Sequence, residues 1–299
     1  MSRRNLSPVD IAGITLGVIA ILAVAGSIVG LARQIPFGHR WQNMDMGDFW
    51  QGRTESGATR AEKEDRFPAD ISEIEIRNIA GSIDIHGGSP DALVVHSVRT
   101  AMMPGALENI RVNYERNGSR LVMEEKHTGG FFRSAGTVAF DVTVPRGVKV
   151  IEVHSVSGSV TVEDVQPGIS QKLTTVSGSI STGKAGNLDV SSTSGSITFV
   201  FGGQDLEART VSGSIQGKID ALSRDGSVRL HSVSGSIEMD AYAALDASVS
   251  LHSLSGAVSC DFPLSATDQK RSSLEGRIGS GAARLEATTT SGPITIRRM

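Results

Sequence analysis

The sequence predicts an all-β protein: a parallel β-solenoid made of Ser-Gly repeats, with an irregular β cap on its N-terminal side and one transmembrane helix before the cap. Three observations predict this fold. A short motif centred on Ser-Gly recurs nine times. Aliphatic residues alternate with polar ones on both sides of the motif, which is typical of strands with one buried face. A run of 22 residues near the N-terminus contains no charge.

Composition excludes several classes of function. Residues 1–40 carry four arginines and one aspartate, a sum of +3, so the net charge of −3 for the whole chain leaves −6 for the rest. A domain of that sign is poorly suited to phosphate backbones, and we expect no nucleic-acid partner. The single cysteine, Cys260, excludes an internal disulfide and a metal site made of several cysteines.

The uncharged run, residues 11–32, is long enough to cross a bilayer, because 22 helical residues span about 33 Å. We expect a signal anchor, with residues 1–10 as a cytoplasmic N-terminus. Arg3 and Arg4 favour that orientation, which places the C-terminal part outside the cytoplasmic membrane. A signal peptide cleaved after residues 23–25 (Ala-Val-Ala) is an alternative, although the apolar run continues further than such peptides usually do. A buried core helix is a third interpretation.

Residues 33–70 are expected to form a juxtamembrane linker. Within them, residues 51–66 are polar and lack aliphatic periodicity, which indicates a flexible spacer. Aromatic residues just after the apolar run suit either a belt at the membrane interface or packing onto the folded domain. They are Phe37, Trp41, Phe49 and Trp50.

Residues 71–147 are expected to form the β cap together with the first repeat. Residues 71–77 and 138–144 alternate as strands do, and residues 110–123 read as a hairpin around Asn117-Gly118, a strong turn signal. Such a cap would shield the first coil of a solenoid.

Residues 148–299 carry the solenoid repeats. In all nine copies of the motif, Ile or Val stands two residues after the glycine, whereas the aliphatic residues upstream stand seven and five residues before it. This change of parity predicts a bend, because one flat strand could not bury both sets. The structural repeat glycines are Gly81, Gly158, Gly178, Gly195, Gly213, Gly235, Gly256, Gly276 and Gly292.

Each repeat is therefore predicted to be two short strands joined at a bend, and stacked repeats would form one aliphatic core. At the bend a side chain would crowd its neighbours, and we expect the backbone to need the positive φ that glycine reaches easily. Stacked in sequence order, the copies from Gly158 to Gly292 would make a rod of about 38 Å. The last strand, residues 294–296, would then be an open edge guarded by charge. An antiparallel β-sandwich is the competing fold.

The run from Val144 to Val150, VPRGVKV, followed by repeated Val-Ser-Gly-Ser-Ile segments, resembles the bacterial "putative adhesin" domain-of-unknown-function family of β-strand-repeat proteins. The likeness covers roughly residues 71–299. It implies an exported or membrane-anchored β-solenoid of the cell envelope, and it carries over no catalytic residue. Many family members have Asp where this chain has serine after the repeat glycine, so no acidic ladder is expected here. These serines are Ser159, Ser179, Ser196, Ser214 and Ser236.

The sequence predicts no catalytic, cofactor-binding or metal-ligating residue. Three residues after each glycine, the outward column is dominated by hydroxyls, and its two acids, Asp84 and Glu238, are far apart. His154, His231 and His252 share one column, four residues before their glycines. The last two belong to successive repeats, but no third ligand stands beside them, so we interpret the three as surface residues.

Other candidate sites are also weak. The repeats place Ile or Val where a calcium-binding β-roll needs Asp, and their serines have no accompanying base. Cys260 has inward parity and is expected to be a core residue. Residues 129–133, Gly-Gly-Phe-Phe-Arg, form an apolar loop that would either fold onto its own domain or touch a membrane or partner.

These observations predict a non-enzymatic, membrane-anchored protein of the cell envelope that presents a β-solenoid for adhesion, partner binding or self-association. The expected partners are the lipid bilayer, through residues 11–32, an unknown protein or envelope component, and a second copy of the chain. An alternative is a scaffold on the cytoplasmic side of the membrane that polymerises through the solenoid ends. A carbohydrate-active β-helix enzyme is the second alternative.

Overall fold

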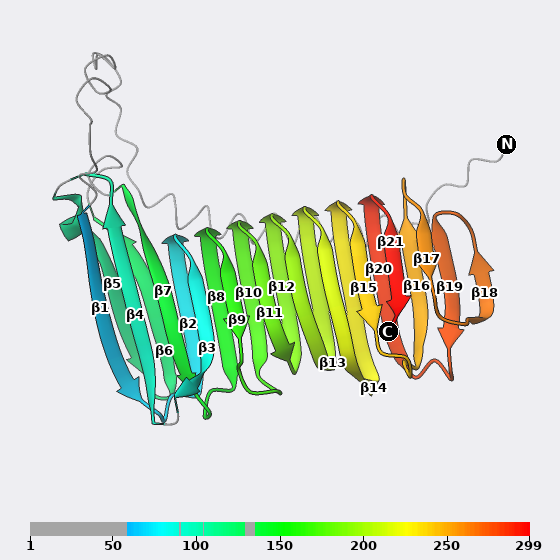
Figure 1. Cartoon of the computed structure of the whole chain (residues 1–299), viewed down its shortest axis with the longest axis horizontal. Coiled ribbons are helices and arrows are strands. Elements are labelled where there is room, and N and C mark those ends of the chain that lie inside the picture. The colour runs from blue at the N-terminus through cyan, green and yellow to red at the C-terminus, as the bar shows by residue number, and fades with distance from the viewer. Residues whose placement is uncertain (1–58, 90, 104, 129–134) are drawn as a thin grey trace, which may run out of the picture.

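A computed structural model describes residues 59–89, 91–103, 105–128 and 135–299 (Figure 1). This part of the chain is all-β, with 21 strands and one short 3-10 helix. None of its helices is long and apolar enough to cross a membrane. Three predicted features lie outside the described residues. They are the transmembrane segment 11–32, the four aromatic residues between positions 37 and 50, and the loop 129–133.

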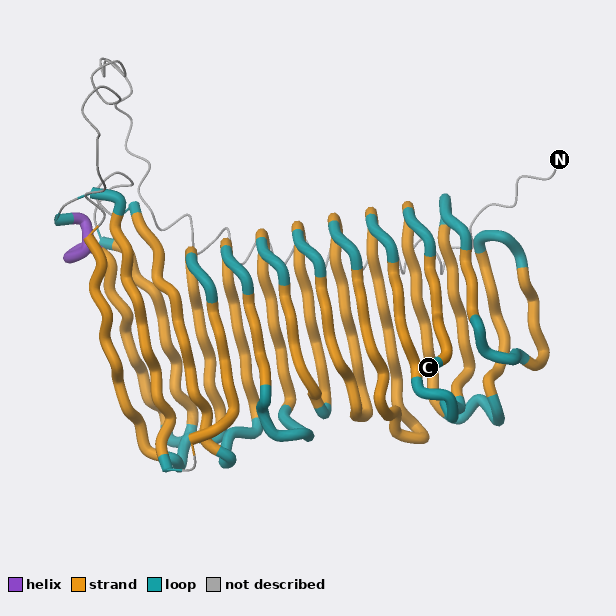
Figure 2. The backbone as a smooth tube through the Cα atoms, viewed as in Figure 1, coloured by secondary structure: helices purple, strands orange, loops and turns teal. Residues whose placement is uncertain are grey.

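Each rung of the solenoid consists of two strands joined at a Ser-Gly corner, and the corners line one long edge of the molecule (Figure 2). The strands before the corners are β2 (Glu73–Ala80), β8 (Val150–Ser157), β10 (Ser170–Ser177), β12 (Asn187–Ser194), β16 (Ala247–Ser253) and β20 (Ala283–Ser291). The strands after the corners are β3 (Ile83–Ser89), β9 (Val160–Glu163), β11 (Ile180–Ala185), β15 (Ile237–Ala241), β17 (Val258–Cys260) and β21 (Ile294–Arg298). Two longer strands, β13 (Ile197–Ser212) and β14 (Ile215–Ser234), run from one rung into the next.

Neighbouring rungs pair in parallel and in register, so equivalent residues stand above one another. The predicted bend explains the core, because both sets of aliphatic residues point inward and form one hydrophobic cluster. The residues two positions after the corner glycine are all buried: Ile83, Val160, Ile180, Ile197, Ile215, Ile237, Val258 and Ile294. By contrast, the aliphatic residues two positions before the glycine, such as Val156 and Val176, are half-exposed on the outer face.

Antiparallel strands close the N-terminal end. Strands β7 (Gly136–Pro145) and β6 (Arg120–His127) pair in parallel with the first rung. Strand β5 (Ile110–Asn117) forms the predicted hairpin with β6, while β4 (Ala92–Ala101) pairs antiparallel with β7. The 3-10 helix η1 (Ala106–Asn109) precedes β5. The rungs pair with one another in parallel, as predicted, but antiparallel strands at the ends make the sheet as a whole mixed.

Part of the predicted linker 33–70 is also a strand. Residues Thr59–Pro68 form β1, which pairs antiparallel with the whole length of β4. The spacer prediction is wrong for residues 59–66, because charged residues such as Arg60 and Glu62 suit an exposed edge strand, which pairs on one side only.

At the C-terminal end the order of the rungs in space differs from their order in the sequence. After β17, the strands β18 (Ser265–Gln269) and β19 (Ser273–Ile278) add an antiparallel end to the sheet. The chain then returns, and β20–β21 lies between β14–β15 and β16–β17 (Figure 1). Two predictions are therefore wrong. Residues 294–296 form an interior strand and not an open edge, and Gly276 lies in antiparallel β19 and not at a corner.

Candidate functional site

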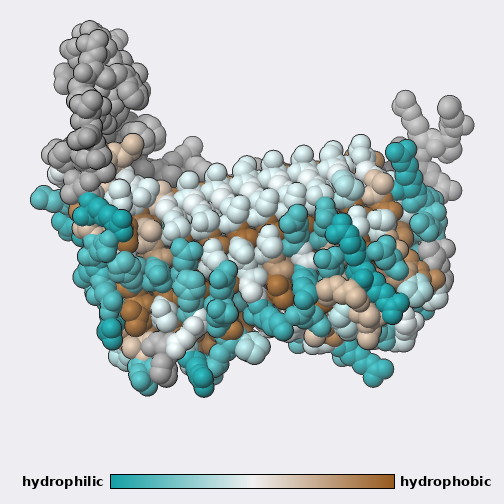
Figure 3. All heavy atoms as spheres, in the orientation of Figure 1, coloured by the Kyte–Doolittle hydropathy of each residue, from teal (hydrophilic) through white to brown (hydrophobic). Residues whose placement is uncertain are grey.

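The corner edge of the solenoid carries a serine ridge, defined here as the serines immediately before the corner glycines. All of them are exposed, and they lie along the corner edge, where Figure 3 shows a pale strip of residues with intermediate hydropathy. Since adjacent strands lie about 4.8 Å apart, the ridge presents hydroxyl groups at a regular spacing. Its members, in spatial order, are Ser157, Ser177, Ser194, Ser212, Ser234, Ser291 and Ser255.

Glycine is required below this ridge because the corners stack backbone on backbone. A Cβ atom on Gly158 would lie 2.0 Å from the carbonyl oxygen of Gly81, and Gly158 has a φ of 137°. The same contact continues through the solenoid, where Gly292 follows Gly235 and Gly256 follows Gly292. Eight of the nine predicted glycines stack in this way: Gly81, Gly158, Gly178, Gly195, Gly213, Gly235, Gly292 and Gly256.

Buried hydroxyl groups support five of the corners from inside, whereas those of Ser155 and Thr175 have no hydrogen-bond partner among the described residues. Three residues before the glycine, Thr210 Oγ1 donates to the carbonyl of Gly195 at 3.2 Å, and Ser253 Oγ donates to that of Gly292 at 2.9 Å. This column was missed in the sequence, although Ser or Thr occupies the position in each rung after the first. Its members are Ser155, Thr175, Ser192, Thr210, Ser232, Ser253 and Thr289, all of them buried.

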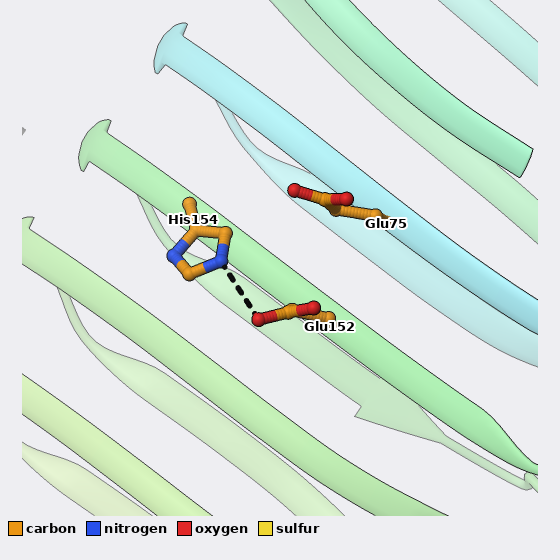
Figure 4. A group of neighbouring side chains, drawn as sticks. All are labelled: Glu75, Glu152 and His154. Carbon is orange, nitrogen blue, oxygen red and sulfur yellow. Dashed lines mark hydrogen bonds and ion pairs between the residues drawn. The ribbon is translucent and has the colours of Figure 1, made fainter. Parts of the chain in front are cut away.

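A charged cluster of six ionisable residues lies where the cap meets the solenoid, on β6, β2, β8 and β10. Glu75 and Glu152 stand opposite each other on β2 and β8, and the side chain of Glu75 is only 4% exposed. His154 points toward Glu152 (Figure 4), with 3.1 Å between Nε2 and Oε1. The cluster consists of Glu75, Arg77, Arg120, Glu152, His154 and Lys172.

Three cations hold the two carboxylates of the charged cluster. Arg120 donates to Glu75 at 2.6 Å and to Glu152 at 3.2 Å, so one guanidinium group bridges both. Arg77 donates to Glu75 at 2.6 Å, and Lys172 donates to Glu152 at 3.1 Å. Burial would raise the pKa of both carboxyls, but these hydrogen bonds outweigh it and hold each pKa below its usual value.

By distance alone this cluster could hold a metal, because single ligand atoms of Glu75, Glu152 and His154 lie within 4.8 Å of one another. The donor set argues otherwise. Both carboxylates are already bound by arginine or lysine, which an incoming cation would have to displace. The arrangement suits an ion-pair network that joins the cap to the solenoid.

The same geometry disfavours acid–base catalysis at this pair. A glycosidase needs one of its two carboxyls protonated, and both pKa values here are lowered, so both groups are ionised near neutral pH. The pair was missed in the sequence because carboxylates were sought three residues after the glycines. Counting six residues before Gly81 and Gly158 would have found it.

The other candidate residues do not come together. His231 and His252 are not neighbours, because Thr288 of the intervening β20 stands between them. Burial and the nearby Arg209 lower the pKa of His231. Cys260 is half-buried against the core, and burial raises the pKa of its thiol, which makes it a poor nucleophile.

A cavity of about 310 Å³ lies at the edge opposite the corners, near the ends of β3 and β7. The residues that line it include Gly87, Val144, Arg146, Asp164, Pro167 and Ile169. Arg146 and Asp164 are its only charged residues, and no histidine, serine or cysteine of the described chain lines it. The described lining of the cavity therefore offers no hydroxyl, thiol or imidazole group and only a single carboxylate, that of Asp164.

Comparison with known proteins places the chain in a family. The profile of the Toastrack DUF4097 family matches residues 133–297, which is more than half of the chain. The chain belongs to the Toastrack DUF4097 family. The resemblance predicted from the VPRGVKV run and the repeats is confirmed.

Several solved structures are similar to this Toastrack protein, all at low identity. A "putative adhesin" from Bacteroides fragilis is 12% identical, with a TM-score of 0.37 over 79% of this chain and 97% of that one. A "putative cell adhesion protein" from Clostridium sporogenes is 10% identical, with a TM-score of 0.36 over 80% and 100%. A "putative adhesin" from Parabacteroides merdae is 11% identical, with a TM-score of 0.38 over 80% and 96%. No curated protein matches the chain.

Proposed function

We propose that this Toastrack protein is a non-enzymatic, single-pass protein of the cell envelope that displays its solenoid outside the cytoplasmic membrane to bind a protein or other envelope partner. One observation carries the proposal: the domain offers long, regular outer faces on which many of the charged groups are held in ion pairs. Examples are the charged cluster and the contacts of Lys184 and Lys218 with Asp220. Such a surface suits recognition better than chemistry.

The position of the first strand supports display of the solenoid away from the membrane. Thr59 begins β1 beside Ala101, at the cap end of the molecule. A membrane anchor at residues 11–32 would therefore tether the cap, and the serine ridge and the C-terminal end would remain accessible to a partner (Figure 1). Both ends of the solenoid are covered by antiparallel strands, which disfavours polymerisation through the solenoid ends.

Anchoring is tested by extraction of membranes with carbonate. The full chain is expected to stay in the membrane fraction, whereas Ile19→Asp with Leu22→Asp is expected to release it, since each acid costs about 3 kcal/mol at the centre of a membrane helix. Ile19→Leu with Leu22→Ile is the matched control. A mature N-terminus near residue 26, found by mass spectrometry, would support the cleaved signal peptide instead.

Orientation is tested with C-terminal reporter fusions. We expect activity from a reporter that works only outside the cytoplasm, and activity of a cytoplasm-only reporter would instead support the scaffold on the cytoplasmic side. Incubation of the purified protein with polysaccharides tests the enzyme alternative, and any turnover would contradict a non-enzymatic role.

A further inference from the structure

The rung β20–β21 comes last in the sequence but lies in space between two rungs that come earlier in the sequence. Strand β20 pairs with β14 on one side and β16 on the other, and β21 pairs with β15 and β17. Its corner is bonded on both sides: Gly235 N donates to the Ser291 carbonyl at 3.0 Å, and Leu254 N donates to the Thr289 carbonyl at 3.1 Å. Both neighbouring rungs have been synthesised before residues 283–298 are added to the chain.

Without this rung, the fold would contain a slot with two facing strand edges. The edges would lie about 9.6 Å apart, two strand spacings, and each would present backbone groups in the register that β20–β21 requires. The slot would also expose the buried Ile237 and Val258, which contact the inserted rung through Ile294. The occupant that matches this slot in backbone register and in side chains is residues 283–298, whether from the same chain or from a second copy.

A short turn decides which copy supplies the rung. Residues 279–282 cross the start of β16, because Ala247 faces Ile278 of β19 on one side and Ala283 of β20 on the other. The Asp246 carboxylate fixes this turn: it accepts hydrogen bonds from Ser280 Oγ at 2.7 Å, from Gly281 N at 2.6 Å and from Ala282 N at 3.2 Å.

We propose that the rung β20–β21 exchanges between two copies of this protein, and that the hydrogen bonds of Asp246 favour the closed, unexchanged form. The rung makes the same contacts in either form, so the balance depends on the turn and on protein concentration. When the turn straightens, residues 283–298 of each copy fill the slot of the other, which gives a closed dimer. The inference goes beyond the proposed function and holds whether or not residues 11–32 anchor the chain.

The test uses single cysteines on the serine ridge, in a full chain that carries Cys260→Ser. Ser234 and Ser291 are exposed neighbours in register, and strand neighbours lie within reach of a disulfide. Chains with Ser234→Cys and chains with Ser291→Cys are co-expressed, so a disulfide between two chains requires Ser291 of one copy beside Ser234 of the other. Ser157→Cys with Ser234→Cys is the control for chance collisions, because these residues lie several rungs apart.

With Asp246→Ala added, we expect severalfold more cross-linked dimer than from the control pair, together with a dimer in light scattering. Asp225→Ala is the matched control for loss of an acid, because Asp225 is exposed and its carboxylate has no hydrogen bond or ion pair to the described residues. A folded Asp246→Ala chain that cross-links no more than the collision control would overturn the proposal.

A second variant covers the case in which Asp246→Ala does not fold. Deletion of residues 279–281 leaves two Cα steps between Ile278 and Ala283, about 7 Å at most, which cannot span the 9.6 Å or so across β16. The proposal requires the deletion variant to be a folded dimer. A variant with three residues added to the same turn should be a monomer. A folded monomer from the deletion, or loss of its β-sheet circular dichroism signal, would contradict exchange.

Discussion

The carbonyl oxygen of Gly178 lies 2.0 Å from the position that a Cβ atom on Gly195 would occupy. The two corners are therefore in direct backbone contact, and no side chain fits between them. The N–H of Gly178 completes the contact by donating to the Ser194 carbonyl at 3.0 Å. Close stacking of this kind holds the serine ridge at its regular spacing.

Gly195→Ala should lower the free energy of unfolding by about 3 kcal/mol or more, because the methyl group meets backbone and Gly195 has a positive φ of 157°. Urea denaturation measures the change. Gly202→Ala is the matched control: a methyl group on Gly202 would meet no heavy atom within 4 Å, and the change should be well under half as large. Equal losses in both variants would contradict the stacking argument.

The buried Gln171 and Thr182 interrupt the aliphatic core of the third rung. Thr182 Oγ1 donates to Gln171 Oε1, while Gln171 Nε2 has no partner among the described residues. Thr182→Val should cost roughly 1–3 kcal/mol, because it leaves both polar ends of the amide unpaired. Adding Gln171→Leu should restore the stability of the wild type or exceed it, since an apolar pair needs no partners.

Thermal and urea unfolding measure the difference in stability between the single and the double variant. Thr161→Val, on the outward face of neighbouring β9, is the control and should change stability by less than about 0.5 kcal/mol. A double variant that is no more stable than Thr182→Val alone would contradict this argument.

Glu75 should make the stability of the protein depend on pH in the acid range. Its pKa is lowered from 4.5 in the folded state, so its contribution is complete above pH 4.5 and is lost as the pH falls through the lowered value. Glu75→Gln should cost about 2 kcal/mol at neutral pH and less as the pH falls. Urea unfolding across this range provides the measurement, with Glu163→Gln as an exposed control. A loss that stays constant with pH would rule out the ionic role.

His231 should titrate below its usual pKa of 6.5, because burial and, to a smaller degree, Arg209 disfavour its charged form. Protonation then favours unfolding, so this residue makes the protein less stable as the pH falls below 6.5. Arg209→Ala should move the pKa part of the way back. Proton NMR of the imidazole measures the shift, and Arg224→Ala, at an exposed position of the same strand β14, should leave it unchanged because Arg224 is not among the charges that act on His231. An unaltered value after Arg209→Ala would exclude the arginine as a cause.

The parts of the fold that were predictable are those with local causes. The alternation around each glycine indicated which face of each strand is buried, and Asn117-Gly118 indicated the β5–β6 hairpin. Strand β1 was not predicted because its sequence is as charged as that of a flexible spacer. Its strand conformation depends on pairing with β4. The charged cluster was missed because Arg120 comes from the cap, and its place beside Glu152 follows from pairing between strands distant in sequence.

The sequence by itself determined that the chain bends at glycine, buries Ile and Val on both sides of the bend and stacks its repeats. These properties follow from side-chain parity and from the space that a corner allows. Only the tertiary structure decided that Gly292 lies between Gly235 and Gly256. Every rung offers the same register and the same aliphatic column, so their order depends on how the chain returns and how its ends are closed.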